Sequence, residues 1–154
     1  MSEMQKETIR LAILGGILVV ASVIQFLGAS FGVIPNFVLA TIVIAALFLG
    51  DIWHELLLLA VALFLLKFSP AVDRELVAFF ATGLLIIGAA RRLPWHRFIN
   101  GIWLTVCAIT VLYALVDPTL IFSFIFAQEL VYTVLVMSVL YYGLMTMRLF
   151  RNVR

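Results

Sequence analysis

Charged residues are scarce in this sequence. Asp, Glu, Lys and Arg make up 12% of its 154 residues, while hydrophobic residues make up 66%. Soluble domains carry about 25% charged and roughly 45–50% apolar residues. The shortage of charge excludes a soluble domain with a solvated surface, and we predict an all-α integral membrane protein with no soluble domain. The longest stretch outside the membrane ends at Arg10, which leaves no room for a soluble catalytic or nucleic-acid-binding unit.

Cysteine and the sequence motifs of catalysis are missing as well. The single cysteine, Cys107, lies within an apolar run, and one cysteine excludes an internal disulfide. The sequence contains no phosphate-binding glycine loop, no HExxH zinc motif and no CxxC pair. It also lacks the GxSxG turn that carries a nucleophilic serine. We therefore expect no enzymatic activity, no cofactor and no metal site.

Long apolar runs are abundant. A membrane helix needs about 20 mostly apolar residues, and roughly 17 suffice. The runs on both sides of the polar group Gly50–Glu55 reach this length with their flanking residues, and the pattern repeats before and after. We predict a single membrane domain, residues 1–154, with six transmembrane helices at about 11–28, 34–50, 52–68, 75–90, 98–116 and 128–149. Residues 119–127 are apolar but too few to cross, and they either lie along the interface or extend the last helix.

Lys and Arg are distributed unevenly between the predicted loops. Cytoplasmic loops of membrane proteins carry an excess of these residues. With six helices and a cytoplasmic N-terminus, eight basic residues lie inside and two lie outside. The eight are Lys6, Arg10, Arg91, Arg92, Arg97, Arg148, Arg151 and Arg154, and the two are Lys67 and Arg74. The distribution predicts that both termini are cytoplasmic.

Asp51, His54 and Glu55 form a polar group between two apolar runs. Their spacing places all three on one side of a helix, where two carboxylates and an imidazole can bind a metal or a proton. The alternative is a solvated turn in which Asp51 caps the next helix and Glu55 supports its start. The sequence has no second His or Cys cluster to complete a metal site, so the turn is favoured.

Glu129 is an isolated charge in the last third of the chain, where the nearest other carboxylate, Asp117, precedes a proline. Together with Gln128 it opens the last predicted helix. Ionisable groups at membrane depth usually face protein or water and are often functional. The alternative is a carboxylate at a helix N-terminus near the outer headgroups. The residues for which we predict a contact with a partner or a ligand are Glu129, Gln128, Asn36 and Asp51.

The chain resembles a known family. Ile34–Phe37 provides a Pro-Asn start for the second predicted helix, Asp51 lies in the hairpin that follows, and Glu129 opens the last helix. Arg148 and Arg151–Asn152 form a basic C-terminal end. With about six helices and almost no loops, this pattern resembles the rod shape-determining protein MreD family. The resemblance implies a non-enzymatic scaffold of the cell-elongation and peptidoglycan-synthesis machinery in the bacterial inner membrane. It also implies a single-pass (bitopic) MreC-type protein as the partner, in addition to membrane lipid.

The same resemblance offers an alternative, because the family fold is similar to that of the substrate-binding subunits of energy-coupling-factor vitamin transporters. A protein that binds a small molecule needs a few convergent polar groups in an otherwise apolar pocket. The candidates for such groups are Gln25, Asn36, Asn100, Thr105, Thr110, Gln128, Glu129 and Tyr132. They are scattered along the sequence, which favours the scaffold over the substrate-binding membrane subunit.

Overall fold

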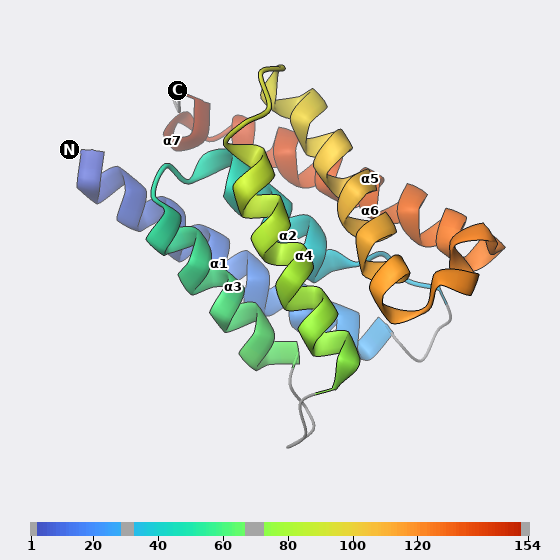
Figure 1. Ribbon diagram of the computed structural model, residues 1–154. Coiled ribbons are helices and arrows are strands. Elements are labelled where there is room, and N and C mark those ends of the chain that lie inside the picture. Colours follow the sequence, from blue (N-terminus) through green and yellow to red (C-terminus); the bar gives the residue numbers. More distant parts are fainter. Residues whose placement is uncertain (1–2, 29–32, 67–72, 152–154) are drawn as a thin grey trace.

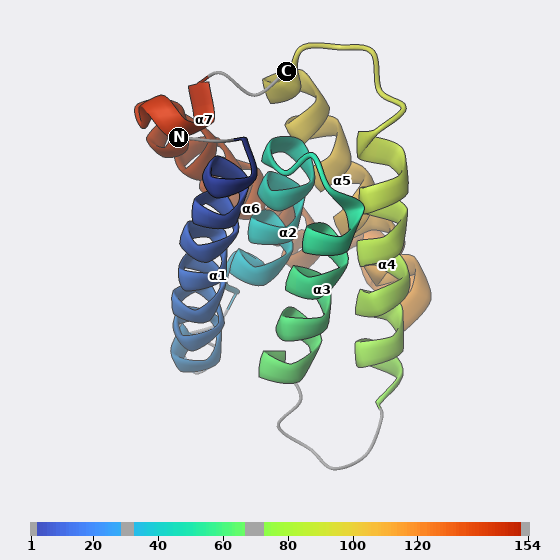
Figure 2. The ribbon, with the colours of Figure 1, turned by 90° about the vertical axis from the view of Figure 1, so that its left-hand side faces the viewer.

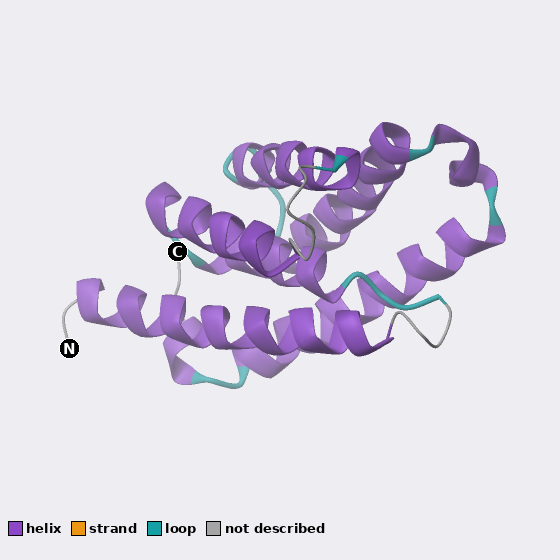
Figure 3. Ribbon diagram, turned by 90° about the horizontal axis from the view of Figure 1, so that it is seen from below, coloured by secondary structure: helices purple, strands orange, loops and turns teal. Residues whose placement is uncertain are grey.

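The protein is a bundle of helices. The computed structural model describes residues 3–28, 33–66 and 73–151, and the regular elements in these ranges are all helical (Figure 1, Figure 3). They are α1 (Glu3–Gly28), α2 (Phe37–Phe48), α3 (Ile52–Leu66), α4 (Arg74–Ala90), α5 (Arg97–Val116), the 3₁₀ helix η2 (Pro118–Phe122), α6 (Phe124–Met145) and α7 (Arg148–Arg151). The all-α class predicted from composition is confirmed for these residues. Lys67 and Arg154 lie outside the described residues.

Three helices are long and apolar enough to cross a membrane. They are α1 from Met4 onward, α5 and α6. At roughly 1.5 Å per residue they extend about 30 Å or more, which matches the hydrocarbon thickness of about 30 Å. Large apolar side chains are exposed along all three, for example Val20, Trp103 and Val139. Length and surface together support a membrane protein.

The short helix α2 occupies the centre of the bundle. It contacts each of the five other long helices, α1, α3, α4, α5 and α6 (Figure 2). Every residue from Val38 to Phe48 is buried. A helix that is apolar on all sides is stable only when it is enclosed. Ala40, Ala45 and Ala46 keep its surface narrow, which lets the neighbouring helices pack closely.

The second and third helices are shorter than predicted. α2 has 12 residues and α3 has 15, whereas the prediction was 34–50 and 52–68. At roughly 1.5 Å per residue they extend about 18 and 22 Å, less than a bilayer core. α2 begins late because the Asn36 side chain caps it, and it ends early because Leu49 is extended. Apolar composition could not reveal these ends, because the flanking residues are apolar too.

The first and last predicted helices also have different bounds. α1 begins at Glu3 and not near residue 11. Arg10, which we predicted to close an extramembrane stretch, is buried in this helix, and its Nε donates to the Leu149 carbonyl at 3.0 Å. α6 spans Phe124–Met145 and not 128–149, because Ser123 caps it by accepting from the Phe126 N–H at 3.1 Å. Residues 119–127 are therefore divided between η2 and α6.

The two ends of the bundle differ in what they carry. We call the end of the bundle where α1 begins and α7 lies the terminal end, because both ends of the described chain lie there (Figure 2). Asp51 and Arg91 belong to this end, because the Glu7 carboxylate near the start of α1 accepts from the Asp51 N–H and Arg91 donates to the Gly50 carbonyl. We call the opposite end, where α4 begins and η2 lies, the η2 end (Figure 1). Asn36, Asp73 and the η2 residue Leu120 surround one cavity there. At the terminal end Phe150 is fully buried, with its ring 5.4 Å from that of Phe48. This contact joins α7 to the last residue of α2.

Candidate functional site

The η2 end contains a cavity of about 370 Å³. The apolar part of its lining comes from four elements that surround the start of α2. The apolar lining residues are Leu66, Leu76, Phe79, Leu112, Val116 and Leu120. Ligand pockets in proteins have volumes of about 300–1,000 Å³ and mostly apolar walls with a few polar groups. The cavity has the size of such a pocket, and its lining is more polar, with seven polar or charged residues beside the six apolar ones.

The polar floor of the cavity is the start of α2. The first N–H groups of a helix have no partner within the helix. Here the Leu39 N–H donates to the Asn36 Oδ1 at 2.9 Å, and the Val38 N–H donates to the Gln25 Oε1 at 3.1 Å. The Phe37 N–H donates to the Pro35 carbonyl at 3.0 Å. These bonds allow a helix to begin inside the protein, away from water.

Asn36 also connects α2 to α6. Its backbone N–H donates to the Thr133 Oγ1 at 2.8 Å, and both residues are buried. Its side chain interacts with the carboxylate of Glu129. Because Glu129 and Thr133 are four residues apart, they lie on the same face of α6. One helix therefore supplies two polar groups to the start of another.

Glu129 lines the cavity and is half-buried. The Tyr113 hydroxyl, from α5, donates to the Glu129 Oε2. A carboxylate is favourable next to a helix N-terminus, where the helix dipole places partial positive charge. Glu129 therefore stabilises the fold in two ways. Its negative charge interacts favourably with the partial positive charge at the start of α2, and its bond with Tyr113 joins α5 to α6.

Three further carboxylates line the cavity at its outer part, Asp73, Glu75 and Asp117. Asp117 accepts hydrogen bonds from the Thr119 hydroxyl at 2.6 Å and from the Thr119 N–H at 3.0 Å. These two bonds, with a smaller contribution from the charge of Arg74, hold the pKa of the Asp117 carboxyl below its ordinary value. Asp117 is therefore ionised near neutral pH. None of the described lining residues is a Lys, Arg or His.

The structure brings together two of the four residues predicted to contact a partner or ligand. Asn36 and Glu129 meet at the cavity floor, whereas Gln128 is not among the lining residues. Asp51 lies at the terminal end, where its N–H donates to the Glu7 carboxylate of α1. Gln25 was a scattered polar candidate and proves to belong to the floor, while Tyr113 was not among the candidates. An isolated glutamate in α6 suggests a hydrogen-bond donor on a neighbouring helix. The sequence does not show which of the tyrosines provides that donor.

The predicted turn at Asp51 is part of a second polar group at the terminal end. The Asp51 Oδ1 accepts from the Trp53 N–H at 3.1 Å, which caps the start of α3. The Glu7 Oε1, from α1, accepts from the Gly50 and Asp51 N–H groups at 3.1 and 2.9 Å. The His54 Nδ1 lies 3.5 Å from the Asp51 Oδ2 and 3.7 Å from the Glu7 Oε1. Within residues 3–28, 33–66 and 73–151 no three His, Cys, Asp or Glu side chains are arranged to hold a metal ion.

Glu55 differs from the solvated helix-start residue that was expected. It is 3% exposed, and its Oε1 lies 3.0 Å from the Arg91 Nη2. Arg91 begins the turn after α4, so the pair joins α3 to α4 at the terminal end. The expectation was wrong because the spacing within residues 51–55 does not reveal a partner that lies 36 residues away.

The fold and the cavity define a class: a helical membrane bundle with a buried central helix and a polar-floored cavity at one end. Comparison of the chain with known protein families, with curated proteins and with solved structures finds no match in any of the three.

Proposed function

We propose that the protein is a non-enzymatic subunit of the bacterial inner membrane that acts as an interaction scaffold in the cell-elongation and peptidoglycan-synthesis machinery. In this proposal the chain crosses the membrane six times, and both termini are cytoplasmic. The resemblance to the MreD family and the eight-to-two distribution of basic residues support it. So does the position of the described chain ends beside the Arg91–His96 turn, at one end of the bundle (Figure 2).

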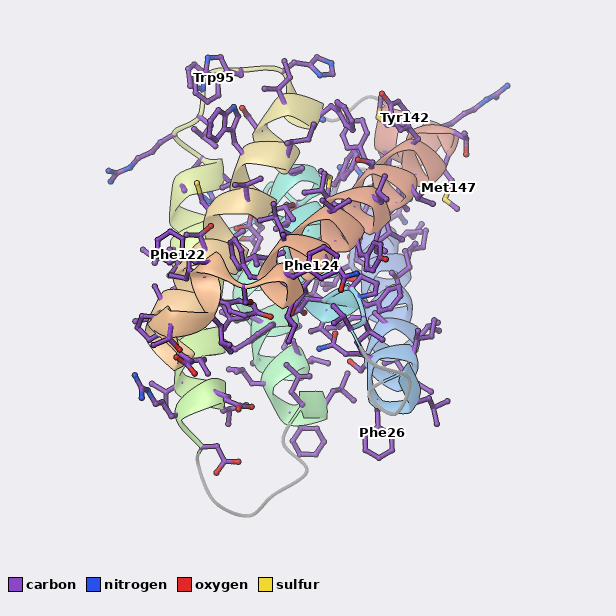
Figure 4. The ribbon with its side chains drawn as sticks, turned by 90° about the vertical axis from the view of Figure 1, so that its right-hand side faces the viewer. Phe26, Trp95, Phe122, Phe124, Tyr142 and Met147 are labelled. Carbon is purple, nitrogen blue, oxygen red and sulfur yellow. The ribbon has the colours of Figure 1, made fainter. Side chains whose placement is uncertain are left out.

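The observation that carries the proposal is the outer face of α6. Thr133, Met137, Tyr141 and Leu144 are buried against the bundle. On the opposite side Val131, Leu135, Val139 and Tyr142 are exposed by 52, 57, 71 and 59%. Their spacing places them in one row along the helix. Figure 4 views this side of the molecule, with Phe124 and Tyr142 marking two points along α6.

The row has space for another helix to approach. A Cβ atom added at Gly143, next to Tyr142, meets nothing within 4 Å. Helices associate in membranes through close packing where small residues permit contact. A row of valine, leucine and tyrosine beside a glycine fits the transmembrane helix of a single-pass protein. The resemblance points to a single-pass MreC-type protein as the occupant.

Photo-crosslinking tests this proposal. A photoreactive residue at Leu135 or Val139 should form an adduct with a single-pass membrane protein in intact cells. The same residue at Leu85, which is 57% exposed on α4, is the matched control and should form no protein adduct. Equal adducts at both helices, or lipid adducts alone at α6, would contradict the scaffold proposal.

A second candidate function is favoured by the cavity: a membrane subunit that binds a small molecule. Asn36, Gln25 and Glu129 converge on one cavity of about 370 Å³ although they are far apart in the sequence. Native mass spectrometry of the protein in detergent tests this candidate. A retained molecule should be present in the natural protein and absent from Leu112→Trp, which fills the cavity from its wall. If the natural protein and Leu112→Trp retain the molecule in equal abundance, the molecule binds outside this cavity.

A further inference from the structure

We propose that the cavity at the η2 end binds a small organic cation with an apolar body, and that its ammonium group contacts the Glu129 carboxylate. The inference rests on the second candidate function, that the cavity holds a small molecule. It adds the chemical class of that molecule.

The charge of the lining is the first reason. Four of the described lining residues carry carboxylates, namely Asp73, Glu75, Asp117 and Glu129, and none is basic. Arg74 balances part of the charge at Asp117. A cavity lined by one sign of charge and bounded by apolar walls concentrates ions of the opposite sign. The occupant that this lining favours is a cation.

The start of α2 gives the second reason, because it is closed to anions. A helix N-terminus binds anions through its exposed N–H groups. In this protein the N–H groups of Asn36, Phe37, Val38 and Leu39 all donate to protein oxygens. The Tyr113 hydroxyl donates to Glu129. An anionic ligand would therefore meet the carboxylates without gaining a backbone N–H donor at the start of α2.

The acceptor capacity of Glu129 is the third reason. An ionised carboxylate offers about four acceptor positions. The described partners of Glu129 are the Tyr113 hydroxyl and the Asn36 side chain. Acceptor positions therefore remain for an ammonium group that enters from the cavity. Leu76, Phe79, Leu112 and Leu120 provide apolar surface for the rest of the molecule.

Three probes that share one body test the charge preference. Tryptamine, tryptophol and indole-3-acetate carry a cationic, a neutral and an anionic group on the same indole ring. Their binding is measured on the full chain in detergent by calorimetry and by thermal shift. Tryptamine should bind about tenfold more tightly than tryptophol, as a charge-assisted hydrogen bond provides, and indole-3-acetate should bind most weakly.

Two variants and a control locate the effect. Glu129→Gln should remove the preference of about tenfold for tryptamine. Glu7→Gln removes a carboxylate at the opposite end and should leave the preference unchanged. Leu112→Trp keeps Glu129 and should abolish binding of all three probes, so the test remains valid if Glu129→Gln does not fold.

Equal binding of tryptamine and tryptophol that Leu112→Trp abolishes would overturn the cation assignment and leave the small-molecule function standing. A preference that survives in Glu129→Gln, or a failure of all three probes to bind, also overturns the assignment. The small-molecule function itself fails when native mass spectrometry finds no molecule that depends on the cavity.

Discussion

Single hydroxyl and carboxyl groups determine how the helices of this protein meet. Thr133 accepts from the backbone N–H of Asn36 at 2.8 Å, 97 residues earlier in the chain. Thr105 is equally buried, but its hydroxyl donates to the Gly101 carbonyl of its own helix at 2.8 Å. Thr133 therefore joins the start of α2 to α6. Thr105 only adds a second hydrogen bond to a carbonyl that already accepts one from a backbone N–H of its own helix.

The first prediction compares these two threonines. Thr133→Val keeps the side-chain shape and leaves the Asn36 N–H buried without an acceptor, which should reduce the free energy of unfolding by about 1–3 kcal/mol. Thr105→Val should reduce it by less than about 1 kcal/mol, because the Gly101 carbonyl keeps its helical partner. Unfolding in detergent followed by circular dichroism measures both. Equal losses of unfolding free energy in the two variants would show that the bond between Thr133 and Asn36 does not stabilise the protein more than the bond within α5.

The ion pair of Glu55 and Arg91 is the second place where one residue decides a helix contact. Removing one partner of a buried pair leaves an uncompensated charge, while replacing both by apolar groups is often neutral. The Glu55 side chain is 2% exposed and that of Arg91 is 40% exposed, so the effect is smaller than for a fully buried pair.

We predict that Arg91→Ala lowers the free energy of unfolding by about 1–3 kcal/mol. The double replacement Glu55→Leu with Arg91→Met should recover most of that loss. Arg92→Ala, at the adjacent exposed position, is the control and should change stability by less than about 0.5 kcal/mol. A double variant as unstable as Arg91→Ala would mean that the ion pair itself stabilises the protein, and that the loss in Arg91→Ala is not due only to the unpaired charge of Glu55.

Among single residues, the sequence allowed Glu129 and Asn36 to be selected but not their partners. An isolated charge and a Pro-Asn helix start are visible without a structure. The contacts of Asn36 with Thr133 and of Glu7 with Asp51 join residues 97 and 44 positions apart, and no local pattern encodes such distances. Arg10 was misplaced because a basic residue ahead of an apolar run has the same pattern whether it is solvated or buried.

At the scale of elements, α4 contains two glycines in different surroundings. A Cβ atom added at Gly83 would lie 2.9 Å from the Leu59 Cδ2 and 3.2 Å from its Cγ. Leu59 is 1% exposed and has little room to move. A Cβ atom added at Gly88 meets nothing within 4 Å. Gly83 therefore permits the close approach of α3 and α4, and Gly88 faces outward.

The third prediction uses this pair. Gly83→Ala should lower the free energy of unfolding by about 1–3 kcal/mol, because overpacking forces α3 and α4 apart. Gly88→Ala should raise it by up to about 1 kcal/mol, because alanine is the better helix former. Thermal unfolding of both variants measures the difference. A stabilising Gly83→Ala would show that Leu59 can move aside.

The existence of the elements was more predictable than their ends. Apolar runs predict helices because a chain in a membrane must satisfy its own backbone groups. The ends of α2 and α6 depend on the side-chain caps of Asn36 and Ser123. Several polar residues near the end of an apolar run can act as its N-cap. Which of them does so depends on how the rest of the chain packs around it. The central position of α2 could not be read from its composition, since lipid and protein are equally apolar surroundings.

At the scale of the whole molecule, the fold places chain ends and turns at two ends of the bundle. The turn after α4, which contains Arg91 and Arg92, and helix α7, which begins at Arg148, belong to the terminal end, whereas α4 begins at Arg74 at the η2 end. Basic residues near membrane helices favour the cytoplasmic side. The terminal end is therefore the expected cytoplasmic end.

The fourth prediction tests this orientation. Cys107 is exposed, so the labelling sites are introduced in a Cys107→Ala chain. Trp95→Cys, in the turn after α4, should react with a membrane-impermeant thiol reagent only after the cells are permeabilised. Thr119→Cys, in η2, should react in intact cells. The opposite result would reverse the orientation and place the cavity on the cytoplasmic side.

The enclosure of α2 also determines an order of events during biosynthesis. α2 is made before α3, α4, α5 and α6, all of which enclose it. Until α6 has been made, the Asn36 N–H lacks the hydroxyl of Thr133, and the side of α2 that α6 covers in the finished bundle lacks this contact. The central helix therefore reaches its final surroundings only after α6 has been made. A chain that is interrupted before Thr133 therefore has an α2 whose Asn36 N–H lacks its acceptor and whose apolar surface is not covered by α6.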